Sequence, residues 1–167
     1  AEIGVVDLGK PLSGEDFAAI QQAIGEGAEL VWGGARLTEG DLAHGYFMQP
    51  AILGKVTPSM QIAQEEVFGP VVVILAVDSF DEAIAVANGV KYGLSASLVT
   101  RDFKKALQYS ERIECGVVKV NQISTGLALQ APFGGVKDSS TDSYREQGTA
   151  ALDFYSRTKT VYFDYSA

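Results

Sequence analysis

The chain has 167 residues, of which 13 are basic and 21 acidic, so its formal net charge is −8. The length allows one compact domain with its own core, and the 47% hydrophobic share excludes disorder as the prevailing state. The acidic balance argues against a nucleic-acid partner, because neutralising phosphates takes clustered Lys and Arg. One Cys excludes an intrachain disulfide, and one Cys with one His argues against a zinc site, so no metal is expected.

No membrane or secretory segment is expected from the sequence. The longest apolar run, Val71–Val77, has seven residues, against the roughly 20 that a membrane-spanning helix needs. The first residues show no basic region followed by an apolar stretch, so no secretory signal is predicted. These features predict a cytoplasmic protein.

The first third of the chain predicts mixed elements. A helix is expected from a cap at Ser13 to about Ile24, followed by short extended pieces at 30–32 and 45–53. Thr57–Pro58 is typical of an N-cap followed by Pro at the first helical position.

The middle of the chain alternates strand and helix. The β-branched run 71–77 predicts a strand buried on both faces, and a Ser-x-x-Glu capping box at Ser79 predicts a helix after it. A strand at 95–100, a helix capped by Asp102 and a strand at 117–121 follow. Helical crossovers of this length join parallel strands. The predicted fold class is therefore α/β, an open, mostly parallel sheet with helices on both faces.

The remaining segments are predicted as follows. On the helix after Asp102, the spacing places on the inner side Phe103, Ala106, Leu107 and Ser110. The stretch 122–140 has no strong period and indicates a long functional loop. Residues 144–154 favour a helix, and 159–165 alternate as a terminal strand, which needs an edge to pair with, such as one in a second subunit.

Several motifs follow one another along the chain. Residues 45–50 are Gly-Tyr-Phe-Met-Gln-Pro, and residues 64–71 are Gln-Glu-Glu-Val-Phe-Gly-Pro-Val. Pro-Phe-Gly-Gly-Val-Lys at 132–137, Arg-Glu-Gln-Gly at 145–148 and Lys-Thr-Val at 159–161 come later. In this order the motifs resemble the aldehyde dehydrogenase superfamily over almost the whole chain.

The resemblance implies that residues 1–155 are the C-terminal part of the family's catalytic domain and that 156–167 are an oligomerisation strand. The family's Gly-rich dinucleotide-binding domain and nucleophilic Cys precede the matching region, and no G-x-G-x-x-G occurs here. Cys115 follows Glu114 near a helix end, where negative potential disfavours a thiolate. We therefore expect Cys115 to be structural and the nucleophile to be absent from the chain.

The resemblance also assigns two cofactor-binding residues. Glu66 is expected to accept hydrogen bonds from the nicotinamide-ribose hydroxyls, since a carboxylate can take two hydroxyls side by side. Phe68 is expected to lie against the nicotinamide ring. The alternatives are a surface carboxylate for Glu66 and core packing for Phe68.

Four further residues are implicated in handling the aldehyde. Phe133 is expected to form a wall of the aldehyde tunnel, with Ile123 and Leu127 in its outer part. A packed loop aromatic is the alternative for Phe133. Glu146 is implied as a partly buried acid that relays a proton, or else as a carboxylate that pairs with Arg145 or a helix dipole.

The implied reaction is oxidation of an aldehyde to a carboxylic acid with NAD or NADP. The longer spacing between Lys137 and Glu146 resembles semialdehyde-oxidising members of the 2-oxoglutarate semialdehyde type. The partners would be the aldehyde and either a homo-oligomer or the missing N-terminal part. Alone, the chain is expected to be inactive and to bind NAD(P) weakly or not at all. The rival hypothesis is a truncated, non-catalytic α/β assembly module that pairs through its terminal strand.

Overall fold

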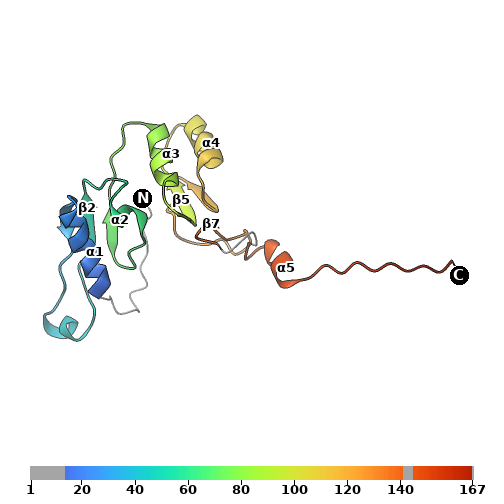
Figure 1. The fold of residues 1–167 in the computed structure, drawn as a ribbon, viewed down its shortest axis with the longest axis horizontal. Helices are drawn as coiled ribbons and strands as arrows, with labels where there is room; N and C mark the ends of the chain where they lie inside the picture. Colours follow the sequence, from blue (N-terminus) through green and yellow to red (C-terminus); the bar gives the residue numbers. More distant parts are fainter. Residues whose placement is uncertain (1–13, 141–144, 167) are drawn as a thin grey trace.

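The computed structural model describes residues 14–140 and 145–166. Figure 1 shows the elements following one another along the long axis, from α1 near one end to the C-terminus at the other. The predicted helix cap Ser13 and the start of the predicted helix 144–154 lie outside the described residues.

The first part of the structure is a small sheet covered by helices. It contains α1 (Gly14–Gly25), β1 (Glu29–Gly33), the 3-10 helix η1 (Gly40–His44), β2 (Ala51–Gly54), α2 (Gln61–Gln64) and β3 (Val71–Val73). The strand order is β1-β2-β3, with β1 antiparallel and β3 parallel to β2. The predicted strand 71–77 is thus shorter than expected, and the extended piece 45–53 joins the sheet only from Ala51.

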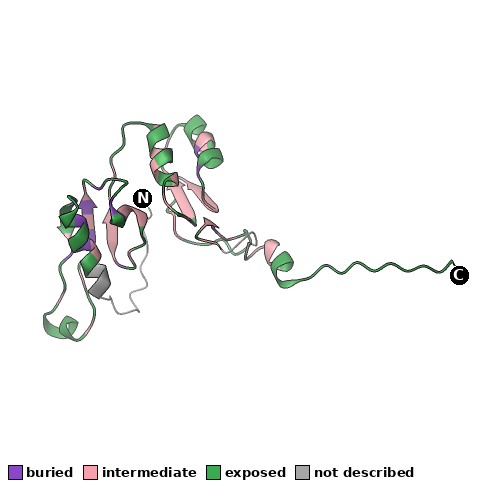
Figure 2. Cartoon of the chain, viewed as in Figure 1, coloured by how far each residue is buried: buried purple, intermediate pink, exposed green. Residues whose placement is uncertain are grey.

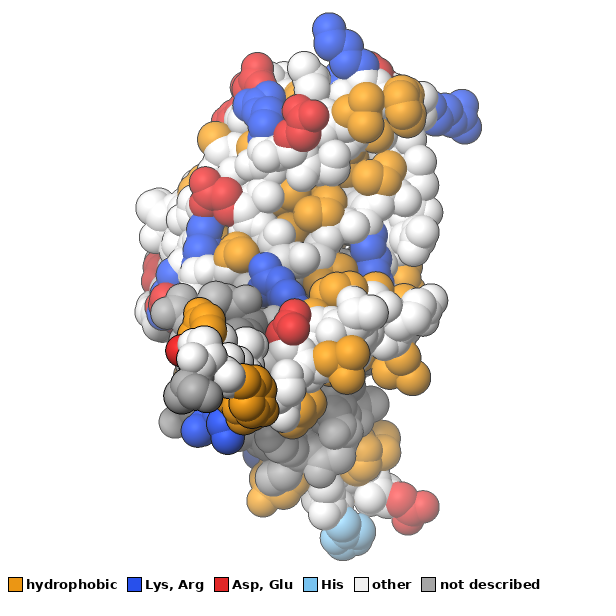
Figure 3. Space-filling view, turned by 90° about the vertical axis from the view of Figure 1, so that its right-hand side faces the viewer, with side chains coloured by type: hydrophobic (Ala, Val, Ile, Leu, Met, Phe, Trp, Pro, Cys, Tyr) orange, Lys and Arg blue, Asp and Glu red, His pale blue; other side chains and the backbone are white. Residues whose placement is uncertain are grey.

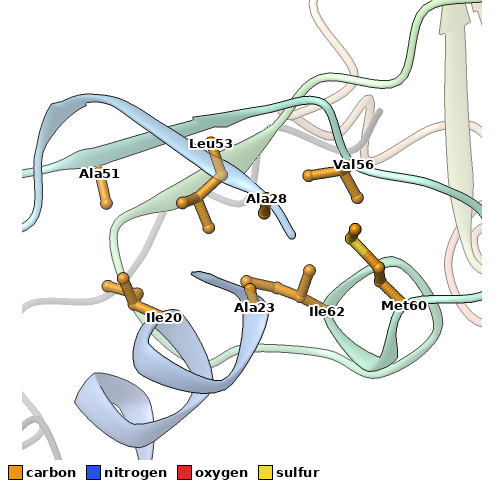
Figure 4. Close-up of a cluster of buried hydrophobic side chains, with 8 residues drawn as sticks. All are labelled: Ile20, Ala23, Ala28, Ala51, Leu53, Val56, Met60 and Ile62. Atoms are coloured by element: carbon orange, nitrogen blue, oxygen red, sulfur yellow. The ribbon is translucent and has the colours of Figure 1, made fainter. Parts of the chain in front are cut away.

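This part has its own hydrophobic core, shown in Figure 4. Its buried side chains come from α1, β2, α2 and the connections between them: Ile20, Ala23, Ala28, Ala51, Leu53, Val56, Met60 and Ile62. Leu53 lies at the centre with no exposed surface. The sheet and both helices are therefore held together by one shared set of apolar contacts.

The start of α2 differs from the prediction. The N-cap is Met60 rather than Thr57, because residues 57–60 form a turn in which the Met60 amide donates to the Thr57 carbonyl at 3.1 Å. The Met60 side chain is buried in the core, 8% exposed. The packing of the Met60 side chain fixes the turn 57–60, so the short helix α2 begins only after this residue.

The second part contains α3 (Phe80–Asn88), β4 (Tyr92–Gly93), β5 (Ser95–Leu98), α4 (Phe103–Arg112) and β6 (Val117–Val120). Both predicted caps are confirmed. The Ser79 hydroxyl accepts from the Glu82 amide, and the Asp102 carboxylate accepts from the amides of Lys104 and Lys105. The predicted order of strands and helices from 71 to 121 is also confirmed.

The predicted single sheet is not found among the described residues. β5 and β6 form a parallel pair of their own, whereas β3 pairs with β2 in the first part. The α/β character is confirmed, but one open parallel sheet with helices on both faces is not. The pattern of each strand predicted the strand itself, while its partner depended on contacts distant in sequence.

The inner face of α4 was predicted wrongly. Tyr109 and Ile113 are buried against Ile84 of α3, whereas Phe103 is 76% and Leu107 50% exposed. The buried face of α4 thus includes Tyr109 and the C-cap residue Ile113. It is rotated around the helix axis from the face that the sequence predicted.

The C-terminal segments begin beside β4 and continue to the far end of the molecule. The loop predicted at 122–140 includes β7 (Val136–Lys137), which pairs antiparallel with β4, and α5 (Ala150–Tyr155) follows. Residues 156–166 extend away from the rest, and each of them is exposed (Figures 1 and 2). They form no ladder within the described residues, so the predicted terminal strand and the domain boundary at 155/156 stay predictions.

No helix in the described ranges has the length and apolar character to cross a membrane.

Figure 3, seen from the side that carries the C-terminus, shows exposed hydrophobic side chains among single acidic and basic ones.

Candidate functional site

The loop 65–70, here called the cofactor loop, joins α2 to β3 and presents two predicted site residues. Short backbone hydrogen bonds shape its second half: Gly69 donates to the Val67 carbonyl at 2.7 Å, and Val71 donates to Gly69 at 2.8 Å. The Ala51 amide donates to the Pro70 carbonyl at 2.8 Å and ties the loop to β2. The folded loop leaves Glu66 exposed and Phe68 66% exposed. Core packing therefore does not hold the Phe68 ring.

Glu66 suits a diol ligand. Its carboxylate forms no hydrogen bond or ion pair with any other residue that the structure describes, and it lines a cavity. Both oxygens are acceptors, which matches the two adjacent hydroxyls of a ribose. Phe68, two residues away, offers an exposed ring to a planar group. The residues present thus fit the nicotinamide riboside of a dinucleotide.

Glu65, by contrast, is bound on both oxygens. The Lys91 ammonium donates to Oε1 at 2.9 Å and lies 2.8 Å from Oε2, and the Tyr92 hydroxyl donates to Oε2 at 3.2 Å. The hydrogen bond from Lys91 is the main cause that lowers the pKa of Glu65, and the same bond raises the pKa of Lys91. No local sequence pattern indicated this pairing, since the partners are 26 residues apart.

A cavity of about 380 Å³ lies between the two hydrophobic cores. Its lining combines the cofactor loop and β3 with α3, β4, β5 and the end of α4, and includes Glu66, Val73, Val90, Tyr92, Ser97 and Cys115. Among the predicted site residues, Glu66 is in this lining, whereas Phe68, Ile123, Leu127, Phe133 and Glu146 are not. Among the residues that line this cavity, Glu66 is thus not joined by the other predicted site residues.

Cys115 is half-buried at the edge of the cavity. Its thiol donates to the Val117 carbonyl at 3.4 Å. Burial, and secondarily the charge of Cys115, raise the pKa of the neighbouring Tyr109 to about 12. These surroundings suit a packed thiol of the kind that the sequence predicted.

The segment 121–127, here called the tunnel loop, begins at the carboxyl ends of β5 and β6. The Thr100 amide donates to Asn121 Oδ1 at 2.8 Å, and the Ser97 hydroxyl donates to the Gln122 carbonyl. The Lys119 ammonium donates to the carbonyls of Thr125 at 2.6 Å and Gly126 at 2.7 Å. The loop is thus tied down at both ends.

The predicted tunnel side chains on this loop point away from the packed core. Ile123 is 74% and Leu127 56% exposed. Sequence reasoning singled out these apolar residues and missed Lys119, which holds the loop that carries them. A lone Lys in an otherwise apolar strand was the available signal, since a charge at such a position needs polar partners.

Phe133 and Glu146 are brought together by a backbone bridge. The Phe133 amide donates to the Glu146 carbonyl at 2.6 Å, and the Glu146 amide donates back at 2.8 Å. Phe133 is half-buried, but Glu146 is exposed, so the predicted partial burial of this acid is not found. The Arg145 guanidinium donates to the Gly135 carbonyl. This isolated bridge places the backbones of Phe133 and Glu146, two predicted site residues, side by side.

Comparison with known proteins assigns the chain to a family. The protein-family model described as "Aldehyde dehydrogenase family" matches residues 16–161. The chain is 54% identical over 147 residues to the alpha-ketoglutarate semialdehyde dehydrogenase of Haloferax volcanii, and 50% identical over 143 residues to the alpha-ketoglutaric semialdehyde dehydrogenase of Bacillus subtilis. These matches cover 87% and 86% of this chain, but only 30% and 29% of the two relatives. The chain thus spans less than a third of their length.

Solved structures agree. The NAD-dependent aldehyde dehydrogenase of Sinorhizobium meliloti has a TM-score of 0.83 at 37% identity, with 92% of this chain and 29% of that one covered. An aldehyde dehydrogenase of Mycobacterium tuberculosis, solved as a complex with NAD+, has a TM-score of 0.81 at 36% identity, with 91% and 30% covered. The chain belongs to the aldehyde dehydrogenase family.

Proposed function

We propose that this chain forms part of an enzyme that oxidises an aldehyde to a carboxylic acid with NAD or NADP. The observation that carries the proposal is the cofactor loop, which is anchored at its end yet leaves the Glu66 carboxylate and the Phe68 ring exposed. Glu66 binds the nicotinamide-ribose hydroxyls, and Phe68 orients the ring. When bound, the nicotinamide takes up the hydride that the aldehyde carbon loses, while water supplies the second carboxylate oxygen.

The chain's other residues shape the path of the substrate. Phe133, Ile123 and Leu127 line part of the aldehyde tunnel and exclude water from it. Glu146 relays a proton toward the catalytic water, from an exposed position rather than the partly buried one that the resemblance implied. The nucleophilic thiol comes from sequence outside these 167 residues, since Cys115 is packed beside Tyr109. The chain alone is therefore expected to be inactive.

A semialdehyde is the proposed substrate class. Relatives at 54% and 50% identity are named for alpha-ketoglutarate semialdehyde, and a third, from Saccharolobus solfataricus, is a 2,5-dioxopentanoate dehydrogenase at 41% identity. Such substrates carry a carboxylate at the end opposite the aldehyde. The tunnel residues proposed here are apolar, so other residues must meet that carboxylate.

A hybrid enzyme tests the proposal. Residues 16–161 of this chain replace the matching region of the full-length Bacillus subtilis relative, and NAD binding and turnover of 2,5-dioxopentanoate are measured. We expect Glu66→Gln to weaken NAD binding about tenfold, by loss of charge-assisted hydrogen bonds. Glu39→Gln, on an exposed segment remote from the cofactor loop, is the control. An unmodified hybrid that fails to bind NAD, or a Glu66→Gln hybrid that binds it unchanged, would contradict the proposal.

The alternative function is a non-catalytic assembly module. It is favoured by residues 156–166, whose exposed Val161, Tyr162 and Phe163 lie on an extended segment. Size-exclusion chromatography of the chain with and without residues 159–167 tests it. An oligomer that dissociates on deletion supports pairing through this segment, and an unchanged size contradicts it.

A further inference from the structure

We propose that Glu65 is a positioning residue that anchors the cofactor loop to β4, so that its neighbour Glu66 faces the cofactor in a fixed orientation. The inference rests on the proposed function, because it concerns the same NAD site. The two adjacent glutamates of the loop then have separate duties, one bound to protein and one to ligand.

The geometry of the anchor is specific. Lys91 reaches both oxygens of Glu65, at 2.9 and 2.8 Å, and the Tyr92 hydroxyl adds a third contact at 3.2 Å. The Lys91 ammonium also lies 5.1 Å from the centroid of the Tyr92 ring, which aligns the two donors with each other. A carboxylate held by three contacts from two consecutive residues has little rotational freedom.

The strand β4, to which Glu65 is bound, is itself held in place. β4 pairs with β7, and the Gly93 amide donates to the Ser139 hydroxyl at 3.0 Å. The Gly116 amide donates to the Gly93 carbonyl at 3.0 Å from the other side. Glu65 is thus tied to a segment that cannot easily follow a moving loop.

Packing holds the middle of the cofactor loop, where Val67 lies against the first core, so the anchor at Glu65 acts on the residues before it. The far end of the loop is held at Pro70 by the amide of Ala51, but its near end leaves α2 with extended backbone at Glu65. The space between the loop and β4–β5 is the cavity, not a packed interface. Consecutive Cα atoms are about 3.8 Å apart, so a rotation at Glu65 carries the Glu66 carboxylate with it.

The simplest alternative is an ordinary surface ion pair. Glu65 and Lys91 are 44% and 46% exposed, and such pairs contribute little to folding stability. That alternative predicts no change in NAD binding when the pair is removed. A positioning role predicts weaker NAD binding with little change in thermal stability, so the two are separable.

The test uses the hybrid enzyme with Glu65→Gln, Lys91→Met, the double variant, and Lys91→Arg as the conservative one. We expect each of the first two to raise the NAD dissociation constant, measured by calorimetry, about three- to tenfold, with kcat nearly unchanged. The double variant should be no worse than either single one, because the residues act through one contact. Lys91→Arg should keep the NAD affinity of the unmodified hybrid, since a guanidinium can also bind both carboxylate oxygens.

The matched control is Glu29→Gln, which removes another surface ion pair, with Lys55 at 2.9 Å, on β1. It should leave NAD binding unchanged. Unchanged binding in Glu65→Gln and Lys91→Met would overturn the proposal, as would a loss that is additive in the double variant. If Glu66→Gln still weakens binding in that case, only the anchor has failed, whereas an inert Glu66→Gln means that the proposed function has failed.

Discussion

The two hydrophobic cores of the molecule differ in how completely they are closed. Within the described residues, the first has eight buried side chains, which come from α1, α2, the strand β2 and the connections between them. The second has three, Ile84, Tyr109 and Ile113, and every residue of its strands β5 and β6 remains partly exposed. Apolar burial is the main favourable term in folding, so the first part is the more self-sufficient of the two. The second part carries the tunnel loop, whose order depends on polar ties.

The largest expected effect is in the first core. Leu53→Ala removes the most deeply buried large side chain and should lower the free energy of unfolding by about 2–5 kcal/mol. Ile84→Ala in the second core should cost less, because partly exposed neighbours can collapse into the space. Urea denaturation of the 167-residue chain measures both, with the fluorescence of Trp32 reporting the first core and circular dichroism reporting the whole chain. Equal losses would contradict the difference between the cores.

A pH titration probes the second core alone. Burial raises the pKa of Tyr109 to about 12, above the ordinary value near 10. The folded state therefore favours the protonated phenol, and this contribution is complete below pH 10 and is lost as the pH rises toward 12. Tyr109→Phe should remove that part of the alkaline loss of stability and change little at pH 7. An unchanged alkaline transition, measured by circular dichroism, would show that Tyr109 is solvated.

A smaller loss is expected at the entry of α4. The Asp102 carboxylate accepts from the Lys104 amide at 2.9 Å and from the Lys105 amide at 3.2 Å. Asp102→Ala leaves these donors without their cap and should cost about 1 kcal/mol. Asp153→Ala, in exposed α5, is the control. If Asp102→Ala unfolded the first core as well, with Trp32 fluorescence changing in the same transition, the two parts would form one cooperative unit.

Local signals in the sequence predicted the elements well. The caps at Ser79 and Asp102 are side chains that bond to amides three or fewer residues away, so the pattern contains all the information. Sheet partners were not predictable in this way. Val71–Val73 has the composition of a buried strand, but nothing in it specifies pairing with Ala51–Leu53 rather than with β5.

The same difference between local signals and contacts distant in sequence applies to the candidate site. The motif at 64–71 indicated Glu66 and Phe68, and both are exposed on the cofactor loop. The bonds that hold the two loops, from Lys91 to Glu65 and from Lys119 to Thr125, were not foreseen. The first joins segments 26 residues apart. The second ends on a backbone carbonyl, which every residue has, so the lone Lys in an apolar strand indicates that polar partners are needed but not which carbonyl supplies them.

The Lys119 tie gives the smallest expected effect on stability and the most local one. Lys119→Met keeps the length and apolar stem of the side chain but removes the donors to Thr125 and Gly126. Because each such bond contributes about 1 kcal/mol or less when exposed, the global unfolding transition should shift little. Amide hydrogen exchange at residues 122–127 should instead become faster, while exchange in β2 stays unchanged. Protection that persists in the tunnel loop would mean that Asn121 and Ser97 hold it without Lys119. The tunnel loop would then be held by these remaining hydrogen bonds as firmly as the first core is held by packing, and the two parts of the molecule would not differ at the candidate site.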